Sequence, residues 1–326
     1  MSLVLVGGDV RRRIAPERTP PKHILSAESL TPDYVDEVCE LAENFEFGFT
    51  KSDHAQGTAV ALLFFQPSTR TRLGFEVATA SLGCHAVGID DMSGSRSNAR
   101  TGETLEDCGA VISNLCDAIV LRHHDAGAAA RIATRSRKPV INAGDGWNEH
   151  PTQALIDLHS IRRGLGSIKG RSIAFGGDPR GRTVRSLIHL LRYELPGEVV
   201  FCPPAHVKIP EDLLNVLSMS QIRCRVIGDI SDALRECDAI MMAPYDMSDI
   251  GEQASSDYIS PRKSPDTHII TAEKIHDTES QSLIFHPLPR QDEIETSCDD
   301  LPNARYFEQV RLSKYVRMAV LDRALR

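Results

Sequence analysis

The pattern of hydrophobic and polar positions shows two kinds of segment, which alternate along nearly the whole chain. Short continuous apolar runs, such as TAVALLFF at residues 58–65, predict strands that are buried on both faces. Longer segments with apolar residues three and four positions apart predict amphipathic helices. Further strands are predicted at 86–89, 118–121, 139–142, 172–175, 198–201, 223–227, 239–242 and 282–285. Helices are predicted at 29–45, 70–82, 102–115, 153–162, 184–193 and 313–325.

This alternation of strands and helices predicts parallel sheets. The pattern restarts after Gly170, and a chain of 326 residues exceeds the usual length of one domain. We therefore predict an α/β protein with two doubly wound parallel-sheet domains and the active site in the cleft between them. The predicted first domain covers residues 22–151 plus the C-terminal helix at about 308–326, the second covers 152–307, and residues 1–21 form an extension.

Composition narrows the class of partner. A formal net charge of −8 argues against an extended surface for nucleic acid, because phosphate backbones attract basic faces. The eight cysteines include no CxxC pair, which argues against a zinc knuckle and favours reduced thiols in a cytoplasmic protein. The N-terminal apolar stretch is too short for a signal peptide or a membrane span. A small molecule is the expected partner.

The segment FFQPSTRTRLGFE at residues 64–76 carries the sharpest chemical signal. A predicted buried strand ends there, and a helix begins at Ser68, Thr69, Arg70 and Thr71. Hydroxyls, free backbone N–H groups and a guanidinium meet at this helix N-terminus, which is the chemistry of a phosphate site. The alternative is a surface helix capped by Ser or Thr, with its arginines in salt bridges.

Two other segments carry polar groups beside glycines or prolines. In NEHPTQALIDLH at 148–159, His150 and Gln153 lie one turn apart, and such groups can orient a carbonyl and an amine without adding charge. The alternative is a capping histidine with a surface glutamine. In FHPLPRQDEIE at 285–295, a strand ends in two prolines, which fix the backbone and leave carbonyls free. By itself this segment would be only a rigid turn.

The loop GGDPRGRT at 176–183 resembles a Walker A loop in which Arg182 replaces the lysine. It leaves open a nucleotide-binding protein or kinase, although the missing lysine weakens the match. A non-catalytic regulatory paralogue, in which the fold serves binding or assembly, is a second alternative. Binding of ATP would indicate the nucleotide-binding protein, and turnover of a substrate would exclude the non-catalytic paralogue.

Five motifs occur in one order along the chain: STRTR, LRH at 121–123, NAGDGxNxHPTQ, GRTVxSL and HPLPR. Because it carries these motifs in this order, the chain resembles the aspartate/ornithine carbamoyltransferase family from about Lys22 to its C-terminus. HPLP, without a cysteine, favours the aspartate branch. The resemblance implies carbamoyl transfer from carbamoyl phosphate to an amino-acid amine, with no metal and no organic cofactor.

The resemblance also implies a site. The residues that match the family's carbamoyl phosphate site are Ser68, Thr69, Arg70, Thr71, Arg122, His150, Gln153, Pro287 and Leu288. Arg70, Thr71, Arg122 and His150 would be the catalytic members of this set. The resemblance assigns the acceptor to Arg182 and Leu288. It implies a homotrimer with shared sites, in which Ser97 and Arg100 reach the site of a neighbouring subunit.

The chain departs from the family where the acceptor would bind. Gln66 stands where the family has a glutamate, and Thr101 where it has a lysine. In the segment APYDMSDIG, Pro244 stands in place of an arginine, Asp246 in place of a glutamine and Asp249 in place of a second arginine. Two aspartates would repel a second carboxylate. This predicts an acceptor with a second amine held by Asp246, such as 2,3-diaminopropionate, in specialised metabolism. The alternative is aspartate carbamoyl transfer for pyrimidine biosynthesis, with a rearranged loop and the lost charge supplied by Arg100.

Overall fold

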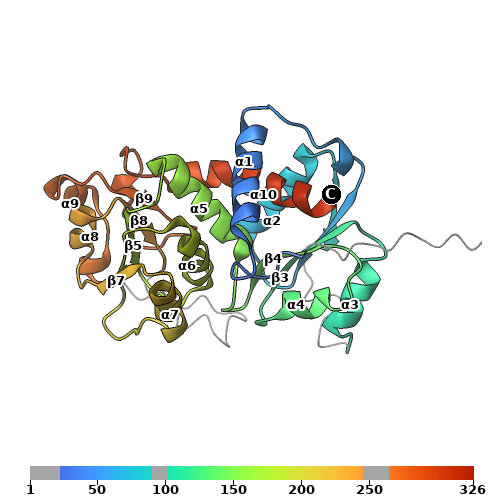
Figure 1. Cartoon of the computed structure of the whole chain (residues 1–326), viewed down its shortest axis with the longest axis horizontal. Helices are drawn as coiled ribbons and strands as arrows, with labels where there is room; N and C mark the ends of the chain where they lie inside the picture. Colours follow the sequence, from blue (N-terminus) through green and yellow to red (C-terminus); the bar gives the residue numbers. More distant parts are fainter. Residues whose placement is uncertain (1–22, 90–101, 245–263) are drawn as a thin grey trace, which may run out of the picture.

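The computed structural model describes residues 23–89, 102–244 and 264–326, which form two sheets whose paired strands are all parallel. The four-stranded sheet has the order β2 (His85–Ile89), β1 (Ala59–Phe64), β3 (Ala118–His123), β4 (Val140–Asp145). The five-stranded sheet has the order β7 (Arg223–Val226), β6 (Glu198–Cys202), β5 (Ser172–Gly176), β8 (Ala239–Met242), β9 (Leu283–Phe285). The two sheets lie side by side in Figure 1. The predicted α/β class with parallel sheets is confirmed.

Each sheet has one topological switch point, where successive strands stop being added on one side and are added on the other. In the first sheet, β1 lies between β2 and β3, and in the second, β5 lies between β6 and β8. Open parallel sheets bind ligands outside the carboxyl ends of the strands at such a point. The residues after β1 and β5, together with the ends of β3 and β8, are therefore the expected position of a site.

Helices cover both sheets. The helices are α1 (Pro32–Glu46), α2 (Thr69–Ser81), α3 (Leu105–Ile112), α4 (Ala128–Ala133), α5 (Pro151–Leu165), α6 (Arg182–Glu194), α7 (Glu211–Met219), α8 (Ile230–Glu236), α9 (Ala272–Asp277) and α10 (Tyr306–Leu325). Short 3-10 turns lie at Asp53–Ala55, Asp266–His268 and Thr296–Cys298. Thr31 caps α1 by accepting from the backbone N–H of Tyr34 at 3.3 Å, and the helix opens with a proline, a residue favoured at the first helical position.

Two helices join the halves of the molecule. α5 leads from the first sheet to the second, and α10 packs against α1, α2 and α5 (Figure 1). One hydrophobic core runs from Val60 and Ile141 of the first sheet through Leu155 and Val316 of these helices to Phe175 of the second. Because a close-packed core resists shifts of its elements, the first turn of α5 is held firmly between the two sheets.

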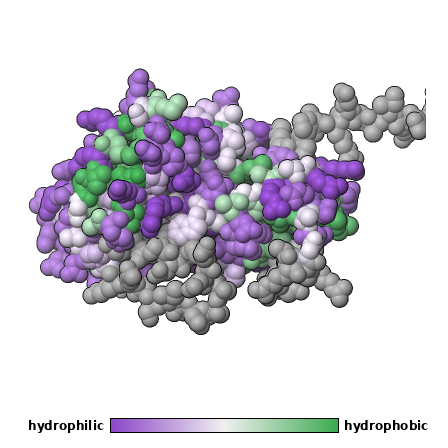
Figure 2. Space-filling model, turned by 90° about the horizontal axis from the view of Figure 1, so that it is seen from below, coloured by the Kyte–Doolittle hydropathy of each residue, from purple (hydrophilic) through white to green (hydrophobic). Residues whose placement is uncertain are grey.

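The face drawn in Figure 2 is mainly hydrophilic, with smaller hydrophobic areas between the polar side chains. Among the described residues, no helix is long and apolar enough to cross a membrane.

Candidate functional site

The N-terminus of α2 is open. Ser68 is the N-cap residue in an extended conformation, yet its side chain makes no capping hydrogen bond. The first helical N–H groups thus keep their capacity to bind an anion. Arg72 Nε donates to Glu76 Oε1 at 2.9 Å, whereas Arg70 forms no ion pair with a described carboxylate. The alternative of a capped, salt-bridged surface helix therefore applies to Arg72 and not to Ser68 or Arg70.

Arg122 extends from the end of β3 into this region. Its Nε donates to Gln66 Oε1 at 3.1 Å and its Nη1 donates to the carbonyl of Ala143 at 3.0 Å. Gly144 has φ +110°, and a Cβ there would overlap the guanidinium, so the close approach requires glycine. Burial, followed by the positive charge of Arg182, holds the pKa of Arg122 well below its usual value.

Arg182 approaches the same position from the other sheet. It is the first residue of α6, and its Nη1 donates to the carbonyl of Gly146 at 2.6 Å. The same nitrogen lies 3.5 Å from Gln66 Oε1, so one neutral amide oxygen faces guanidiniums from both halves of the molecule. Burial lowers the pKa of Arg182 to about 10, which leaves it charged at neutral pH.

His150 is the residue before the first turn of α5. Its backbone N–H donates to Ser186 Oγ at 2.8 Å, and its ring Nδ1 lies 3.3 Å from Thr152 Oγ1. Burial, followed by the charges of Arg122, Arg182 and Arg317, lowers the pKa of His150 well below its usual range. The imidazole is therefore neutral at pH 7 and can donate one hydrogen bond without adding a charge.

Gln153 lies on the first turn of α5, and its Nε2 donates to Asp157 Oδ1 at 2.7 Å. Pro287 and Leu288 are half-buried after β9, and the backbone N–H of Leu288 donates to His286 Nδ1 at 2.7 Å. Leu288 has φ +57°, a conformation that a leucine rarely adopts and that the surrounding hydrogen bonds stabilise.

Three predicted site residues, Ser97, Arg100 and Asp246, lie outside the described residues, as does Asp249. Pro244 is described, and its carbonyl accepts from the backbone N–H of Asp178 at 3.1 Å. The end of β8 is therefore tied to the loop that leads into Arg182.

Among the described residues, one group has the side-chain composition of a metal site. The ligand atoms of His123, His124 and Asp125 lie within 4.8 Å of one another. However, His123 Nδ1 already accepts from the backbone N–H of Asp125 at 2.9 Å, and the rings of His123 and His124 are stacked. These contacts account for the group without an ion.

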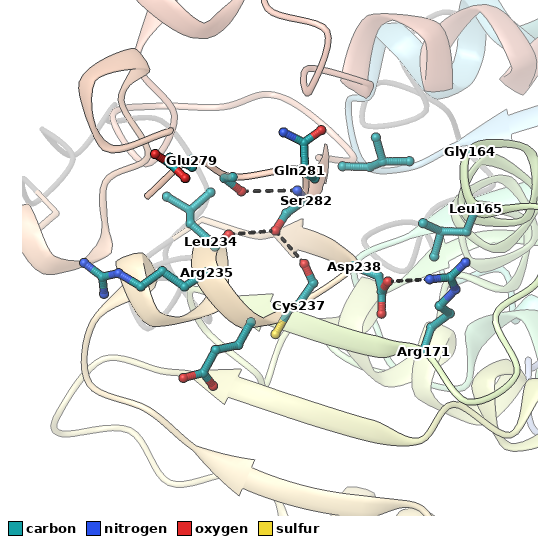
Figure 3. A pocket seen from close by; sticks show the side chains of 13 residues that line it. Gly164, Leu165, Arg171, Leu234, Arg235, Cys237, Asp238, Glu279, Gln281 and Ser282 are labelled. Atoms are coloured by element: carbon teal, nitrogen blue, oxygen red, sulfur yellow. Dashed lines mark hydrogen bonds and ion pairs between the residues drawn. The ribbon is translucent and has the colours of Figure 1, made fainter. Parts of the chain in front are cut away.

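A cavity of about 480 Å³ lies elsewhere, around the amino ends of β8 and β9 (Figure 3). Its charged residues include Arg171, which pairs with Asp238 at 2.8 Å, and Arg235, which pairs with Asp232 at 3.1 Å. None of the predicted site residues lines it. The carboxyl ends of the strands, and not this cavity, therefore hold the convergent polar groups that a site needs.

Comparisons with known proteins match the fold over most of the chain. Residues 22–163 match the carbamoyl-P binding domain of aspartate/ornithine carbamoyltransferases, and residues 169–324 match the Asp/Orn binding domain. The chain is 37% identical over 310 residues to the aspartate carbamoyltransferase catalytic subunit of Methanococcus aeolicus, covering 92% of this chain and 95% of that protein. It is 36% identical over 286 residues to the chloroplastic aspartate carbamoyltransferase of Arabidopsis thaliana, covering 87% and 72% respectively.

Solved structures show the same likeness. The catalytic subunit of M. Jannaschii aspartate transcarbamoylase has a TM-score of 0.79 and 34% identity, covering 93% of this chain and 97% of that one. Aspartate transcarbamoylase from Trypanosoma cruzi, in complex with carbamoyl phosphate and aspartate, has a TM-score of 0.80 and 28% identity, covering 93% and 95%. The fold and these matches define a carbamoyl-transferring enzyme. The chain belongs to the aspartate/ornithine carbamoyltransferase family.

Several residues beside the site were not singled out from the sequence. Asp157 lies four positions after Gln153 on a helix, and that spacing is a signal for a contact. Gln309 also donates to Asp157, from a helix 152 residues away in the sequence. Arg317, on the same distant helix, lowers the pKa of His150 and is almost fully buried. Nothing local in the sequence connects either of these residues to the site.

Proposed function

We propose that this chain transfers the carbamoyl group of carbamoyl phosphate to the amine of an amino acid at the carboxyl ends of β1, β3 and β5. The observation that carries this proposal is the group of guanidiniums of Arg70, Arg122 and Arg182. The charges of Arg182 and Arg70 both lower the pKa of Arg122. None of the three arginines forms an ion pair with a carboxylate among the described residues. The charge of Asp145 acts on Arg122 and Arg182 without forming an ion pair, so the group keeps an excess of positive charge that favours an anionic ligand.

The phosphate of the donor would bind at the N-terminus of α2. Ser68 and Thr69 offer hydroxyls, the first helical N–H groups are uncapped, and Arg70 supplies charge. A helix N-terminus favours an anion through both its free N–H groups and its dipole. The buried hydroxyl of Thr71 would face the carbonyl end of the donor.

Transfer needs stabilisation of the carbonyl oxygen. As the amine attacks, a C–N bond forms, negative charge grows on the carbonyl oxygen, and the C–O bond to phosphate then breaks. Arg122, the neutral imidazole of His150 and the hydroxyl of Thr71 would donate to that oxygen, which lowers the barrier because they are already oriented. The departing phosphate would accept the proton that the amine loses. Gln153 and the carbonyls of Pro287 and Leu288 would hold the amine of the carbamoyl group.

Aspartate is the acceptor that we propose. The relatives are named aspartate carbamoyltransferases, and two matched structures contain aspartate. Arg182 would bind one carboxylate of the amino acid, because its pKa of about 10 leaves it charged. Arg100 would supply the charge for the second carboxylate, from the neighbouring subunit of a homotrimer. The trimer and the roles of Ser97 and Arg100 stay predictions.

A diamino acid is the second candidate. Position 244, where the resemblance expects an arginine, holds a proline that is fixed beside the loop leading to Arg182. No charge at this position can grip a side-chain carboxylate. Asp246 would instead pair with an ammonium group, which suits 2,3-diaminopropionate.

The acceptor should be measured by phosphate release from carbamoyl phosphate with aspartate, 2,3-diaminopropionate and ornithine. We expect saturable, acceptor-dependent release with aspartate and little with the other two, because the matched relatives are named aspartate carbamoyltransferases. Release without any acceptor is the control. Efficient turnover of 2,3-diaminopropionate with none of aspartate would replace the first candidate by the second. Binding of carbamoyl phosphate without turnover of any acceptor would favour the non-catalytic paralogue.

A further inference from the structure

A chain of buried hydrogen bonds joins α5, α10 and the segment that follows β9. Its centre is Asp157, which is 0% exposed, and Gln309, which is 2% exposed. Asp157 Oδ1 accepts from Gln153 Nε2 at 2.7 Å and from Gln309 Nε2 at 2.6 Å. The same carboxyl oxygen thus anchors two amides that come from different helices.

This oxygen determines how both amides are turned. A side-chain amide has an oxygen and a nitrogen at its two ends, and an acceptor such as Asp157 Oδ1 can bond only the nitrogen. Gln153 Oε1 must therefore point away from Asp157. Gln309 Oε1 accepts from the backbone N–H of His286 at 3.0 Å, which confirms that its amide is turned in the same sense.

The chain of bonds continues into the segment 286–288. His286 Nε2 lies 2.7 Å from Glu293 Oε1, and Leu288 donates its backbone N–H to His286 Nδ1 at 2.7 Å. Since Nδ1 accepts, the ring proton is on Nε2 and is donated to Glu293. Gln309 thereby fixes the backbone N–H of His286, and Glu293 fixes its ring, which in turn accepts from Leu288.

Burial of such polar groups is costly unless every partner is present. Burial raises the pKa of Asp157 to about 7, and the hydrogen bonds from Gln153 and Gln309, followed by the charge of Arg317, partly oppose that rise. Asp157 Oδ2 has no hydrogen-bond partner among the described residues. An apolar residue would pack here at lower cost, so stability alone does not explain a carboxyl at this position.

We propose that Asp157 is a positioning residue that makes the site selective for a carbamoyl group over an acyl group of the same shape. By fixing the amide of Gln153, it presents Gln153 Oε1 to the donor's –NH₂ group. Through Gln309 and His286 it also holds the carbonyls of Pro287 and Leu288 toward that group. The inference rests on the proposed binding of carbamoyl phosphate at this site.

The test compares carbamoyl phosphate with acetyl phosphate, in which a methyl group replaces –NH₂. For the wild type, Asp157→Ala and Asp157→Asn, the dissociation constants of both compounds and of inorganic phosphate are measured by calorimetry. We expect Asp157→Ala to lose about tenfold in its preference for carbamoyl phosphate, because the freed amide can turn its own –NH₂ toward the donor. Asp157→Asn should keep most of the preference, since its Oδ1 can still accept from both glutamines.

Phosphate affinity separates positioning from general damage, because phosphate binds at α2 and lacks the amine. An unchanged preference in a folded Asp157→Ala protein would contradict the inference, as would equal losses for all three compounds. If Asp157→Ala does not fold, Gln309→Met decides by the same measurement: it should lose preference at unchanged phosphate affinity, and an unchanged preference would overturn the inference. Failure of the proposed function itself would show in the wild type as no binding of carbamoyl phosphate.

Discussion

Replacing Arg122 with alanine should lower kcat/KM for carbamoyl transfer by about a thousandfold, the upper end of the range for losing a group that stabilises an oxyanion. The guanidinium is buried, lies at the end of β3, and is aimed by Gln66 and the carbonyl of Ala143. The guanidinium stabilises the negative charge that grows on the carbonyl oxygen in the transition state, so kcat should fall along with kcat/KM. Steady-state rates of phosphate release at saturating acceptor provide the measurement.

Arg131→Ala is the matched control. Arg131 belongs to the same half of the molecule, but its Nε donates to Glu106 at 2.8 Å on the surface. Exposed pairs of this kind contribute little, so activity should stay within about twofold of wild type. The ligand-free melting temperature of Arg122→Ala should lie within about 4 °C of wild type, which excludes unfolding as the cause. Activity near that of wild type in Arg122→Ala would contradict the assigned role.

Arg70→Ala should remove about half or more of the thermal stabilisation that carbamoyl phosphate or inorganic phosphate gives the wild type. A ligand present at a hundred times its dissociation constant stabilises the folded state by about 2.7 kcal/mol. Loss of one charge-assisted hydrogen bond costs about 1.5–3 kcal/mol of binding. With Kd raised by that amount, the same ligand concentration stabilises the variant by only about 0.3–1.3 kcal/mol, so the rise in melting temperature should fall to about half of its wild-type value or less.

Arg72→Ala removes the same charge two positions later on α2. Arg72 Nε donates to Glu76, and its guanidinium lies 5.8 Å from the ring of Phe64. We expect this variant to keep the phosphate response, because the contact of Arg70 and not the general positive charge binds the anion. Equal losses in both variants would show that the helix terminus acts only through long-range charge.

Much of the fold could be predicted because the strands are continuous apolar runs and the long helices have clear periodicity. Helices α4, α7, α8 and α9 were missed. Those of six or seven residues are too short for a helical period to show, whereas α7 has nine residues and its Leu213 and Leu217, four positions apart, are a helical signal that was overlooked. In α4 the sequence AAARIA also has almost no polar face, so no alternation exists to detect.

The boundaries of two predicted helices were wrong for local reasons. The last helix begins at Tyr306 and not at 313, because its first turns bury Tyr306 and Gln309 while Phe307 and Val310 are exposed. With a polar residue buried and two apolar residues exposed, the first turns do not show the pattern of an amphipathic helix. The helix predicted at 102–115 spans Leu105–Ile112, since the side chain of Thr104 accepts from the backbone N–H of Asp107 and sets the start.

The candidate site could be predicted where its chemistry is local in the sequence. Ser68 to Thr71 form one helix start, and His150 and Gln153 form another. Contacts between distant residues could not be predicted, because a sequence does not state which side chains meet. The sharing of Gln66 Oε1 by Arg122 and Arg182 depends on the two sheets lying side by side, and so does the contact of Gln309 with Asp157.

The central claim is that this chain moves a carbamoyl group from phosphate to an amino-acid amine at this site. The most direct measurement incubates the protein with carbamoyl phosphate labelled with ¹³C at its carbonyl carbon, together with aspartate, and follows that carbon by NMR. We predict an N-carbamoyl amino acid that forms in step with inorganic phosphate, and whose formation depends on Arg122. Decay of carbamoyl phosphate at the same rate with and without the protein, and no carbamoylated product from aspartate or from a diamino acid, would contradict the account.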